Sequence, residues 1–294
     1  MNPEAGLFPA FVVLCEELNF TRAAEKLNMS QPTLSRRIKQ LETQVGCTLF
    51  DRSTRHVWLT PAGHALLAGS RLALADMERG VEDARRASRG SPSRLRLGVT
   101  LSGDADLVPS ILRSFRERHP TVEVLIDRAP TESHVLDLQR GRIDASFVRL
   151  PLTDSDLLDV VPIRGDDMLI VLPDDHPLAN QHAVAIEDLE DEALIMFSRG
   201  LSEGHFDHIV RHIRPTEDPA TVVFQPRPDE EAMIVAVAEG AGFTVATARR
   251  IRQIQVPGTI ALPLTPALQT ELGLAWRKDS PHDLTRSFVE LARR

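Results

Sequence analysis

Residues 18–63 read LNFTRAAEKLNMSQPTLSRRIKQLETQVGCTLFDRSTRHVWLTPAG, and this stretch decides the fold of the N-terminal part of the chain. Ser30 is a good N-cap, and Pro32 falls in the first helical turn, where its missing N–H costs nothing. After that cap an apolar residue recurs every three or four positions, at Leu34, Ile38, Leu41 and Val45. The spacing predicts a helix with one face turned to a core.

The opposite face of this helix is polar and carries Pro32, Thr33, Arg36, Lys39 and Gln40, with Ser35 and Arg37 beside them. A polar face of this kind is usually a solvated helix surface. The preceding segment favours a second interpretation, because we expect Thr21 to cap a helix with small residues at Ala23 and Ala24 and a short turn at 28–29. Two helices joined so tightly are typical of a helix-turn-helix that places its second helix in the DNA major groove.

The segment after this helix predicts a β-wing. Phe50 is followed by several polar residues, an alternating stretch at 56–60 and a stop at Pro61. We expect Arg52 and Arg55 to reach phosphates or the minor groove from this wing.

A long helix is expected from Pro61 to Arg89, because no further proline occurs there. Apolar or small residues recur at heptad spacing, at Leu67, Ser70, Leu74, Met77, Val81 and Ala84. About eight turns of helix exceed what a small winged domain can cover. The pattern therefore predicts pairing with a second copy, and a polar hinge follows at 88–93.

The first 63 residues resemble the N-terminal domain of LysR-type transcriptional regulators. The resemblance is carried by Leu7, Phe11, residues 19–24, Leu27, residues 30–32, Ser35, Ile38, Leu41, Glu42, Gly46, Leu49, Phe50, Arg52, Thr60 and Gly63. It implies that the start of the second helix approaches base edges, that the wing arginines hold the DNA backbone, and that paired long helices bring two winged domains onto an inverted repeat. The DNA-binding candidates are Thr21, Gln31, Pro32, Thr33, Ser35, Arg36, Lys39, Arg52 and Arg55.

The charge distribution is uneven along the 294 residues. The net charge of −8 alone would disfavour a DNA-binding protein. However, residues 1–90 hold 12 of the 34 basic and 10 of the 42 acidic residues. The remaining residues therefore hold 22 basic and 32 acidic side chains, a net charge of −10. Residues 20–60 contain seven basic and three acidic side chains. This local excess of positive charge is what a DNA-reading module needs.

The cysteines and the hydropathy pattern bear on the compartment. Cys15 and Cys47 both lie in the N-terminal part, so we expect no structural disulfide and no thiol-based peroxide sensor in the C-terminal domain. No run of about 18 apolar residues and no signal-peptide pattern occurs, so we expect a cytoplasmic protein without a membrane partner.

From Arg94 onward short apolar runs alternate with helical patterns. We expect strands at 95–101, 122–127, 144–149, 168–172, 194–197, 221–225, 243–246 and 272–276, and helices at 107–118, 132–140, 206–213 and 230–239. This alternation predicts α/β units with open, largely parallel sheets, in which ligands bind beyond the carboxyl ends of the strands.

The stretches LVPSILRSFRERHPTVEVLI and LQRGRIDASFVR resemble the effector domain of the same family, which has the two-lobed α/β fold of periplasmic binding proteins. The resemblance implies an all-α winged helix-turn-helix at 1–60, a linker and dimerisation helix at 61–90 and an effector domain at 91–294. Lobe I would cover about 95–162 and 267–294, and lobe II about 163–266, with crossings near 161–164 and 262–267.

Four polar residues at expected strand ends are candidates for a ligand site: Thr100, Ser102, Thr131 and Arg149. Hydroxyls and helix N-termini suit an anion, and an arginine can bind a carboxylate through two hydrogen bonds. The alternatives are that Thr131 is only a helix cap and that Arg149 pairs with Asp154 or Asp156. We add Ser198, Ser202 and Phe206 of the second lobe as closing contacts.

The sequence GRIDASFVR also resembles a particular branch of the family. In the branch that senses aromatic acids and dicarboxylates such as muconate, Ser102, Thr131 and Arg149 would occupy ligand-binding positions. A small residue usually precedes the arginine there, whereas this chain has Val148.

Catalytic and metal-binding patterns are weak. His205, His208 and His212 could share a helix face, but no cysteine or carboxylate cluster completes a ligand set, so we expect no metal and no cofactor. The glycines at 240 and 242 follow a helix and fit a helix-to-strand turn better than a phosphate loop. No Gly-x-Ser-x-Gly elbow and no His-Glu-x-x-His pair occurs, so we expect no enzyme.

These features predict a sequence-specific transcriptional regulator of LysR type that is dimeric through the long helix and tetrameric through its effector domains, with RNA polymerase as a further partner. A small anionic metabolite would close the cleft and change the bend of the bound DNA. Two alternatives stay open: a ligand-independent DNA-binding repressor, and an enzyme or solute carrier with an appended DNA-binding module.

Overall fold

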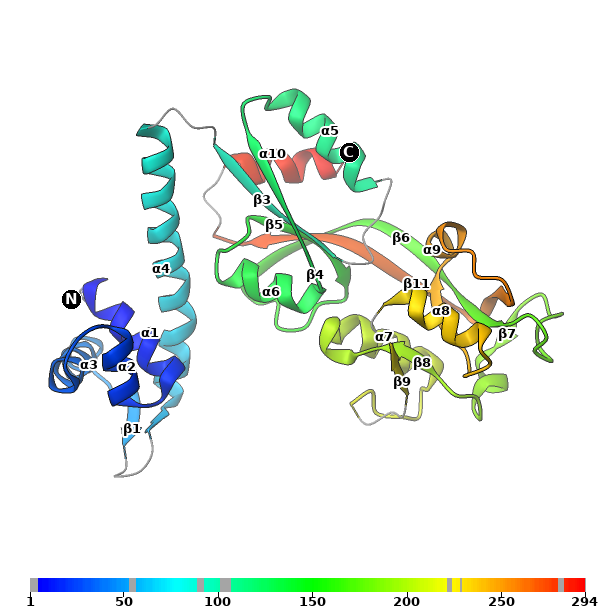
Figure 1. Cartoon of the computed structure of the whole chain (residues 1–294), viewed down its shortest axis with the longest axis horizontal. Coiled ribbons are helices and arrows are strands. Elements are labelled where there is room, and N and C mark those ends of the chain that lie inside the picture. The colour runs from blue at the N-terminus through cyan, green and yellow to red at the C-terminus, as the bar shows by residue number, and fades with distance from the viewer. Residues whose placement is uncertain are drawn as a thin grey trace. The chain divides into compact units, whose positions relative to one another are not determined.

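The structure is a computed structural model, and it describes residues 5–52, 57–88, 93–100, 107–220, 224–227, 229–279 and 283–293. The chain forms two compact units, Met1–Ser91 and Pro92–Arg294 (Figure 1). No described helix is long and apolar enough to cross a membrane.

The first unit consists of helices followed by a two-stranded wing. Its elements are the 3-10 helix η1 (Ala5–Leu7), α1 (Phe8–Glu17), α2 (Phe20–Lys26), α3 (Gln31–Val45), β1 (Phe50–Arg52), β2 (Val57–Leu59) and α4 (Pro61–Ser88). The helix-turn-helix, the wing and the long helix are confirmed. The wing strands pair antiparallel, with Phe50 opposite Leu59, and the wing tip at 53–56 lies outside the described residues.

Helix α3 begins where the sequence predicts. Ser30 Oγ accepts a hydrogen bond from the Thr33 amide, and the stripe of Leu34, Ile38 and Leu41 is fully buried. On the same helix, Glu42 Oε1 accepts hydrogen bonds from the amides of Leu49 (2.9 Å) and Phe50 (3.3 Å), which ties the wing to α3. The wing is therefore fixed to the helix that we expect to enter the groove.

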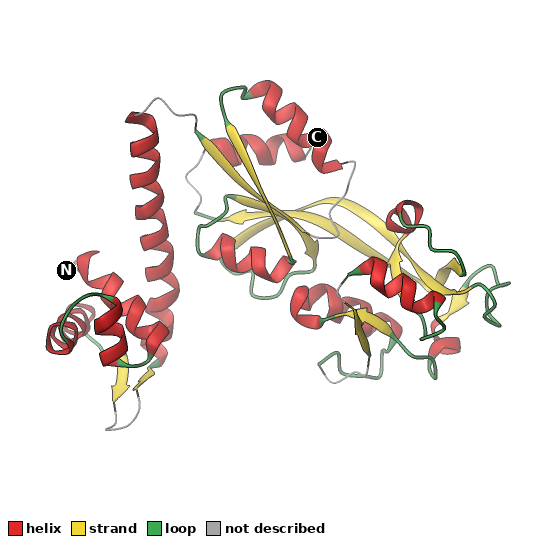
Figure 2. Ribbon diagram, viewed as in Figure 1, coloured by secondary structure: helices red, strands yellow, loops and turns green. Residues whose placement is uncertain are grey.

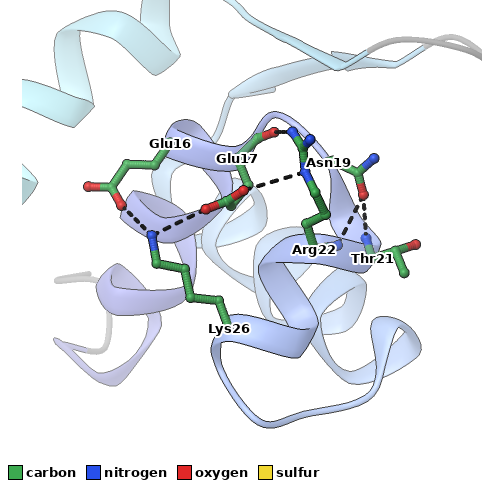
Figure 3. Close-up of polar contacts among 6 residues, drawn as sticks. All are labelled: Glu16, Glu17, Asn19, Thr21, Arg22 and Lys26. Atoms are coloured by element: carbon green, nitrogen blue, oxygen red, sulfur yellow. Dashed lines mark hydrogen bonds and ion pairs between the residues drawn. The ribbon is translucent and has the colours of Figure 1, made fainter.

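The cap of α2 differs from the prediction. Asn19, and not Thr21, is the N-cap, because its Oδ1 accepts hydrogen bonds from the amides of Thr21 (2.9 Å) and Arg22 (3.1 Å) (Figure 3). The extended backbone of Asn19 aims its short side chain at both amides. Thr21 therefore lies inside the first helical turn.

Helix α4 is continuous from Pro61 to Ser88 (Figure 2). Thr60 Oγ1 accepts a hydrogen bond from the Gly63 amide (3.0 Å) and donates one to the Thr48 carbonyl (2.9 Å), which joins the helix start to the wing. Gly63 is required there, since a Cβ would overlap the Leu49 carbonyl oxygen. Farther along the predicted seam, Met77 and Val81 are 56% and 51% exposed within the single chain.

The second unit is built on a mixed sheet with the strand order β10-β6-β11-β5-β3-β4, to which β7 adds beside β11. The strands are β3 (Arg94–Thr100), β4 (Glu123–Ala129), β5 (Ala145–Leu150), β6 (Leu158–Pro173), β7 (Val184–Ala185), β10 (Thr244–Thr247) and β11 (Thr259–Arg277). A separate parallel pair consists of β8 (Ile195–Phe197) and β9 (Gln225–Arg227). The predicted strand at 221–225 falls mostly on residues outside the described part.

The helices cover this sheet in two groups. They are α5 (Leu107–Arg118), α6 (Thr131–Gln139) and α10 (Asp283–Ala292) in lobe I, and α7 (Glu203–Ile213), α8 (Glu230–Ala238) and α9 (Ala248–Gln253) in lobe II, with the 3-10 helices η2 (Ile186–Leu189) and η3 (Arg199–Leu201). Each lobe has its own apolar cores. Phe115, Phe147 and Phe288 pack edge to face in lobe I, and Phe206 and Phe243 are fully buried in lobe II.

One expectation for this unit is wrong. The sheet is not largely parallel, because β11 runs antiparallel to β5 and β6, and β6 runs antiparallel to β10. The segments expected as crossings, near 161–164 and 262–267, lie within β6 and β11, which are 16 and 19 residues long and pair with each other across both lobes (Figure 2). A β-bulge between Pro263 and Leu268 accommodates Pro263 and Pro266 in β11.

Candidate DNA-binding face and effector cavity

The polar face of α3 is open to solvent. Gln31, Pro32, Arg36 and Lys39 are exposed, whereas Thr33 and Ser35 are half-buried. Thr33 Oγ1 lies 2.8 Å from Ser30 Oγ, so its hydroxyl also belongs to the helix cap. Arg36 and Lys39 form no ion pair with a carboxylate of the described residues, and their charges face water.

The other candidates of the first unit are less well placed by the structure. Thr21 is exposed at the start of α2. Arg52 belongs to β1, but its side chain and the whole of Arg55 lie outside the described part of the chain.

The basic residues of α2 are engaged by carboxylates. Lys26 Nζ lies 3.2 Å from both Glu16 Oε2 and Glu17 Oε1, and Arg22 Nε lies 3.4 Å from Glu17 Oε2 (Figure 3). These hydrogen bonds to Glu16 and Glu17 raise the pKa of Lys26 above its ordinary value. The charges of α2 are therefore paired with carboxylates at the end of α1, whereas those of Arg36 and Lys39 on α3 stay open to a partner.

A small cavity lies within the second unit between the two lobes. Its volume is about 100 Å³, and it is lined by Thr100, Pro130, Thr131, Arg149, Phe197, Leu201, Ser202, His205, Asp229, Glu230 and Arg250. Lobe I supplies the end of β3, the start of α6 and β5. Lobe II supplies the residues around η3 and the starts of α7, α8 and α9.

Four of the predicted ligand-binding residues meet in this cavity: Thr100, Thr131, Arg149 and Ser202. Ser102 lies outside the described residues. Ser198 is exposed and does not line the cavity, and Phe206 is fully buried in the core of lobe II, where it packs against Phe197 and Phe224. The spacing along α7 did not distinguish Phe206, which faces the core, from its neighbour His205, which faces the cavity.

Arg149 is the most deeply buried cation of the cavity. It is 5% exposed, and its amide donates a hydrogen bond to Thr131 Oγ1 (3.2 Å), which joins β5 to the start of α6. Burial lowers the pKa of the Arg149 guanidinium, while the carboxylates of Glu230 and Asp166 raise it. The influential carboxylates therefore come from α8 and β6, rather than from Asp154 or Asp156 nearby in sequence.

A network of arginines and carboxylates surrounds Arg149. Arg250 Nε lies 3.1 Å from Glu230 Oε2, and Arg249 Nε lies 3.3 Å from Asp166 Oδ1. Burial raises the pKa of Glu230, and Arg149 and Arg250 lower it. Burial also lowers the pKa of Arg164, which lies close to Arg249 and Asp166. The arginines at 149, 164, 249 and 250 thus lie within electrostatic reach of the carboxylates of Asp166 or Glu230.

His205 forms part of the wall beside Arg149. Its ring stacks on Phe197, with centroids 5.8 Å apart and an interplanar angle of 12°, and its Nδ1 lies 3.3 Å from Thr270 Oγ1. Burial, together with the positive charge of Arg149, lowers the pKa of His205 from 6.5 to about 3. His205 is therefore neutral at physiological pH, and with Phe197 it gives the cavity a flat, weakly polar side.

The lobes touch beside the cavity. Glu132 Oε1, from α6 in lobe I, accepts a hydrogen bond from the Glu203 amide at the start of α7 in lobe II (2.8 Å). Burial raises the pKa of Glu132. Gly204 lies so close to the Pro151 carbonyl that a Cβ would overlap it. The start of α7 is therefore pressed directly against lobe I.

The histidines of α7 do not converge on one point. His208 Nε2 lies 2.8 Å from the Gln269 carbonyl and His212 Nε2 lies 2.8 Å from the Pro266 carbonyl, while His205 faces Thr270. No group of three His, Cys, Asp or Glu side chains that could hold a metal ion occurs among the residues that the structure describes.

Sequence reasoning missed the contribution of α8 and α9 to the cavity. Asp229 caps α8 through a hydrogen bond from the Ala232 amide (2.9 Å), so Glu230 begins the helix. A cap followed by an acidic residue was visible in the sequence, but nothing local showed that this helix start faces β5.

Known proteins resemble both units. Residues 7–64 match the family described as bacterial regulatory helix-turn-helix protein, lysR family, and residues 88–294 match the LysR substrate binding domain. The transcriptional regulator AlsR of Bacillus subtilis is 30% identical over 282 residues, which cover 96% of this chain and 93% of that protein.

Two solved structures resemble the whole chain. A full-length OxyR from Pseudomonas aeruginosa, in which one cysteine is replaced by aspartate, is 25% identical with a TM-score of 0.61, and the match covers 99% of this chain and 94% of that one. Full-length BenM is 26% identical with a TM-score of 0.59, and the match covers 99% and 95%.

Proposed function

Because the chain belongs to the LysR family of DNA-binding transcriptional regulators, which join a helix-turn-helix to an effector-binding domain, we propose that its effector is a small carboxylate held by Arg149. The observation that carries this proposal is the burial of the Arg149 guanidinium in the wall of a small cavity. A buried arginine presents paired N–H donors whose geometry matches a carboxylate.

The burial of Arg149 favours an anionic effector. Arg149 is 5% exposed and lines the cavity together with the less buried Arg250. A bound carboxylate would further offset the cost of burying the Arg149 guanidinium. The α6, α7 and α8 N-termini at the cavity add partial positive charge, which also suits an anion.

The size of the cavity favours a small acid. Its volume of about 100 Å³ suits a small molecule. The absence of cysteine from residues 93–294 leaves no thiol for redox sensing in the effector domain.

The proposed response is a change in the placement of the lobes. Arg149 and Thr131 belong to lobe I, while Ser202 and Glu230 belong to lobe II, so a ligand that contacts both groups binds the closed arrangement more tightly. Such differential affinity is what shifts a conformational equilibrium. Movement of the lobes would then alter how paired winged domains bend an inverted repeat.

Pairing through α4 is part of the proposal. Met77 and Val81 leave apolar surface exposed on the single helix, and a second copy of the same helix would cover it. The α3 face would enter the major groove, with Gln31, Pro32, Thr33, Ser35 and Arg36 near base edges and Lys39, Arg52 and Arg55 near phosphates. The effector domains would join two dimers into a tetramer.

A thermal-shift titration of the full chain tests the effector proposal. We expect at least one acid from a panel of two- to five-carbon carboxylates to raise the melting temperature of the effector unit. Arg149→Ala, and the longer Arg149→Met in case the smaller side chain unfolds the unit, should abolish that rise. Arg211→Ala, at an arginine that is 65% exposed on α7, is the matched control.

An unchanged thermal shift in the Arg149 variants would contradict the cavity assignment. If no acid of the panel shifts the melting temperature while the chain still binds its operator, a ligand-independent repressor becomes the better interpretation.

A further inference from the structure

The effector cavity is lined by groups of opposite charge that come from different lobes. Arg149 projects from β5 of lobe I, and Glu230 projects from the first turn of α8 in lobe II. The Glu230 side chain is only 19% exposed. An acid whose only polar group is a carboxylate could bind Arg149. It would offer no hydrogen-bond donor to the second carboxylate at the cavity, that of Glu230.

The contact with Arg250 uses only part of the hydrogen-bonding capacity of the Glu230 carboxylate. The contact joins Arg250 Nε to one oxygen, Glu230 Oε2, whereas an ionised carboxylate can accept about four hydrogen bonds. Burial raises the pKa of Glu230 more than Arg149 and Arg250 lower it. A hydrogen-bond donor brought by a ligand would supply what is missing.

The rest of the described lining offers Glu230 few donors. Phe197 and Leu201 are apolar, and the neutral His205 ring is stacked on Phe197 with its Nδ1 turned to Thr270. The hydroxyls of Thr100, Thr131 and Ser202 also line the cavity, but among the described residues it is Arg250 that contacts the Glu230 carboxylate. A donor carried by the ligand would add to that contact.

We infer that the effector bears a hydrogen-bond donor beside its carboxylate, so that it is a small hydroxy acid or amino acid, with the carboxylate on Arg149 and the donor on Glu230. This inference rests on the proposed function. It adds that the two ends of the ligand engage different lobes, because Arg149 and Glu230 come from different lobes. Closure of the two lobes then depends on the polar groups at both ends of the ligand as well as on its size and shape.

Calorimetric titration of the full chain with acids of one carbon skeleton tests this inference. Propionate, lactate, 3-hydroxypropionate, alanine and β-alanine differ only in the donor and its position, and butyrate with its 2-hydroxy, 3-hydroxy and 2-amino derivatives forms a second series. In the unaltered protein at least one donor-bearing acid should bind tenfold or more tightly than the unsubstituted acid of its series.

Substitutions at Glu230 distinguish the two kinds of donor. Glu230→Ala should reduce the preference to within about threefold, since the acceptor is gone. Glu230→Gln keeps a carbonyl acceptor of the same size, so it should retain preference for a hydroxy acid and lose preference for an amino acid. Glu231→Ala, at an exposed carboxylate next along α8, is the matched control and should leave every affinity unchanged.

The outcomes separate the inference from the proposed function. If the unsubstituted acid binds as tightly as its derivatives, or if the preference survives Glu230→Ala, the inference is overturned while carboxylate sensing at Arg149 stands. If no acid of either series binds, the inference fails, and if no carboxylate of the wider panel binds either, the proposed function fails with it. Melting curves of the unliganded variants establish that each remains folded.

Discussion

On α3 of the first unit Arg36 and Lys39 are exposed to solvent, whereas in the second unit Arg149 is buried and shares its cavity with Glu230 and Arg250. The exposed cations retain their hydration and are screened by salt within about 10 Å. The buried cations have lost much of their hydration, so their energy depends on the partners within reach. The same residue type thus faces DNA, a long polyanion, in one unit and, in our proposal, a single small anion in the other.

This contrast predicts how each unit responds to a lost charge. In the first unit a substitution should change an affinity for DNA, in proportion to salt, and leave stability nearly unchanged. In the second unit a substitution should change stability itself, because the partner left behind stays buried. The two tryptophans allow separate readings, since Trp58 lies in the wing and Trp276 in β11. A Trp58→Phe background reports the second unit alone.

The largest effect should follow Asp166→Asn. Asp166 is 7% exposed in its side chain, pairs with Arg249 at 3.3 Å, and moderates the charge of the neighbouring Arg164. Removing its charge leaves two guanidinium groups close together, which should destabilise the effector unit by about 3 kcal/mol. Urea unfolding followed by Trp276 fluorescence measures the change.

Asp283→Asn is the control for this experiment. Asp283 pairs with Arg286 at 3.4 Å, but its side chain is 92% exposed, so the loss should stay below about 0.5 kcal/mol. Equal losses in the two variants would remove the distinction between buried and exposed charges in this unit.

Next in size is the effect of Arg36→Ala on DNA binding. A side chain that reads a base edge contributes about 1–3 kcal/mol of discrimination, so affinity for a specific inverted repeat should fall about 10- to 100-fold, with a much smaller loss on random DNA. Lys39→Ala should weaken both DNAs alike and reduce the slope of affinity against salt by about one. Fluorescence anisotropy at several salt concentrations measures both, and equal losses on the two DNAs for Arg36→Ala would make it a phosphate contact.

A smaller effect is expected from His205 on the pH dependence of stability. Its pKa of about 3 in the folded chain lies below the ordinary 6.5, so the unfolded chain takes up the proton first as the pH falls. Its stabilising contribution is complete above pH 6.5 and is lost between 6.5 and 3. The loss reaches about 1.4 kcal/mol at pH 5.5.

His205→Gln should remove this part of the pH dependence. His182→Gln, at an exposed histidine of the same unit, should leave it unchanged. Urea unfolding of the three proteins at about pH 7.5 and 5.5 gives the comparison. A His205→Gln variant that still loses as much stability as the unaltered chain at low pH would show that other groups cause the loss.

The contrast between the units also explains what could be predicted from the sequence. The α3 face follows from local information, namely the Ser30 cap and the spacing of Leu34, Ile38 and Leu41. Thr131 and Arg149 could be proposed because helix starts and strand ends meet at one edge of a sheet. Glu230 and Arg250 could not, because only the tertiary path of β6 and β11 brings α8 and α9 to the cavity.

The smallest effect should follow Lys26→Ala, although Lys26 is a cation of the helix-turn-helix and contacts two carboxylates at 3.2 Å. Both the Lys26 and Glu16 side chains are largely exposed, and holding long side chains in one geometry costs entropy that offsets the attraction. The Asn19 cap and the buried residues Ala23 and Ala24 still hold α2 in place. The melting temperature of the first unit should therefore be unchanged within error.

Affinity for the operator should also match the unaltered chain, because Glu16 and Glu17 already compensate this charge. A salt-dependent loss of affinity would instead mean that Lys26 leaves its carboxylates for a phosphate when DNA binds, and the division between engaged and open cations within the first unit would then be wrong.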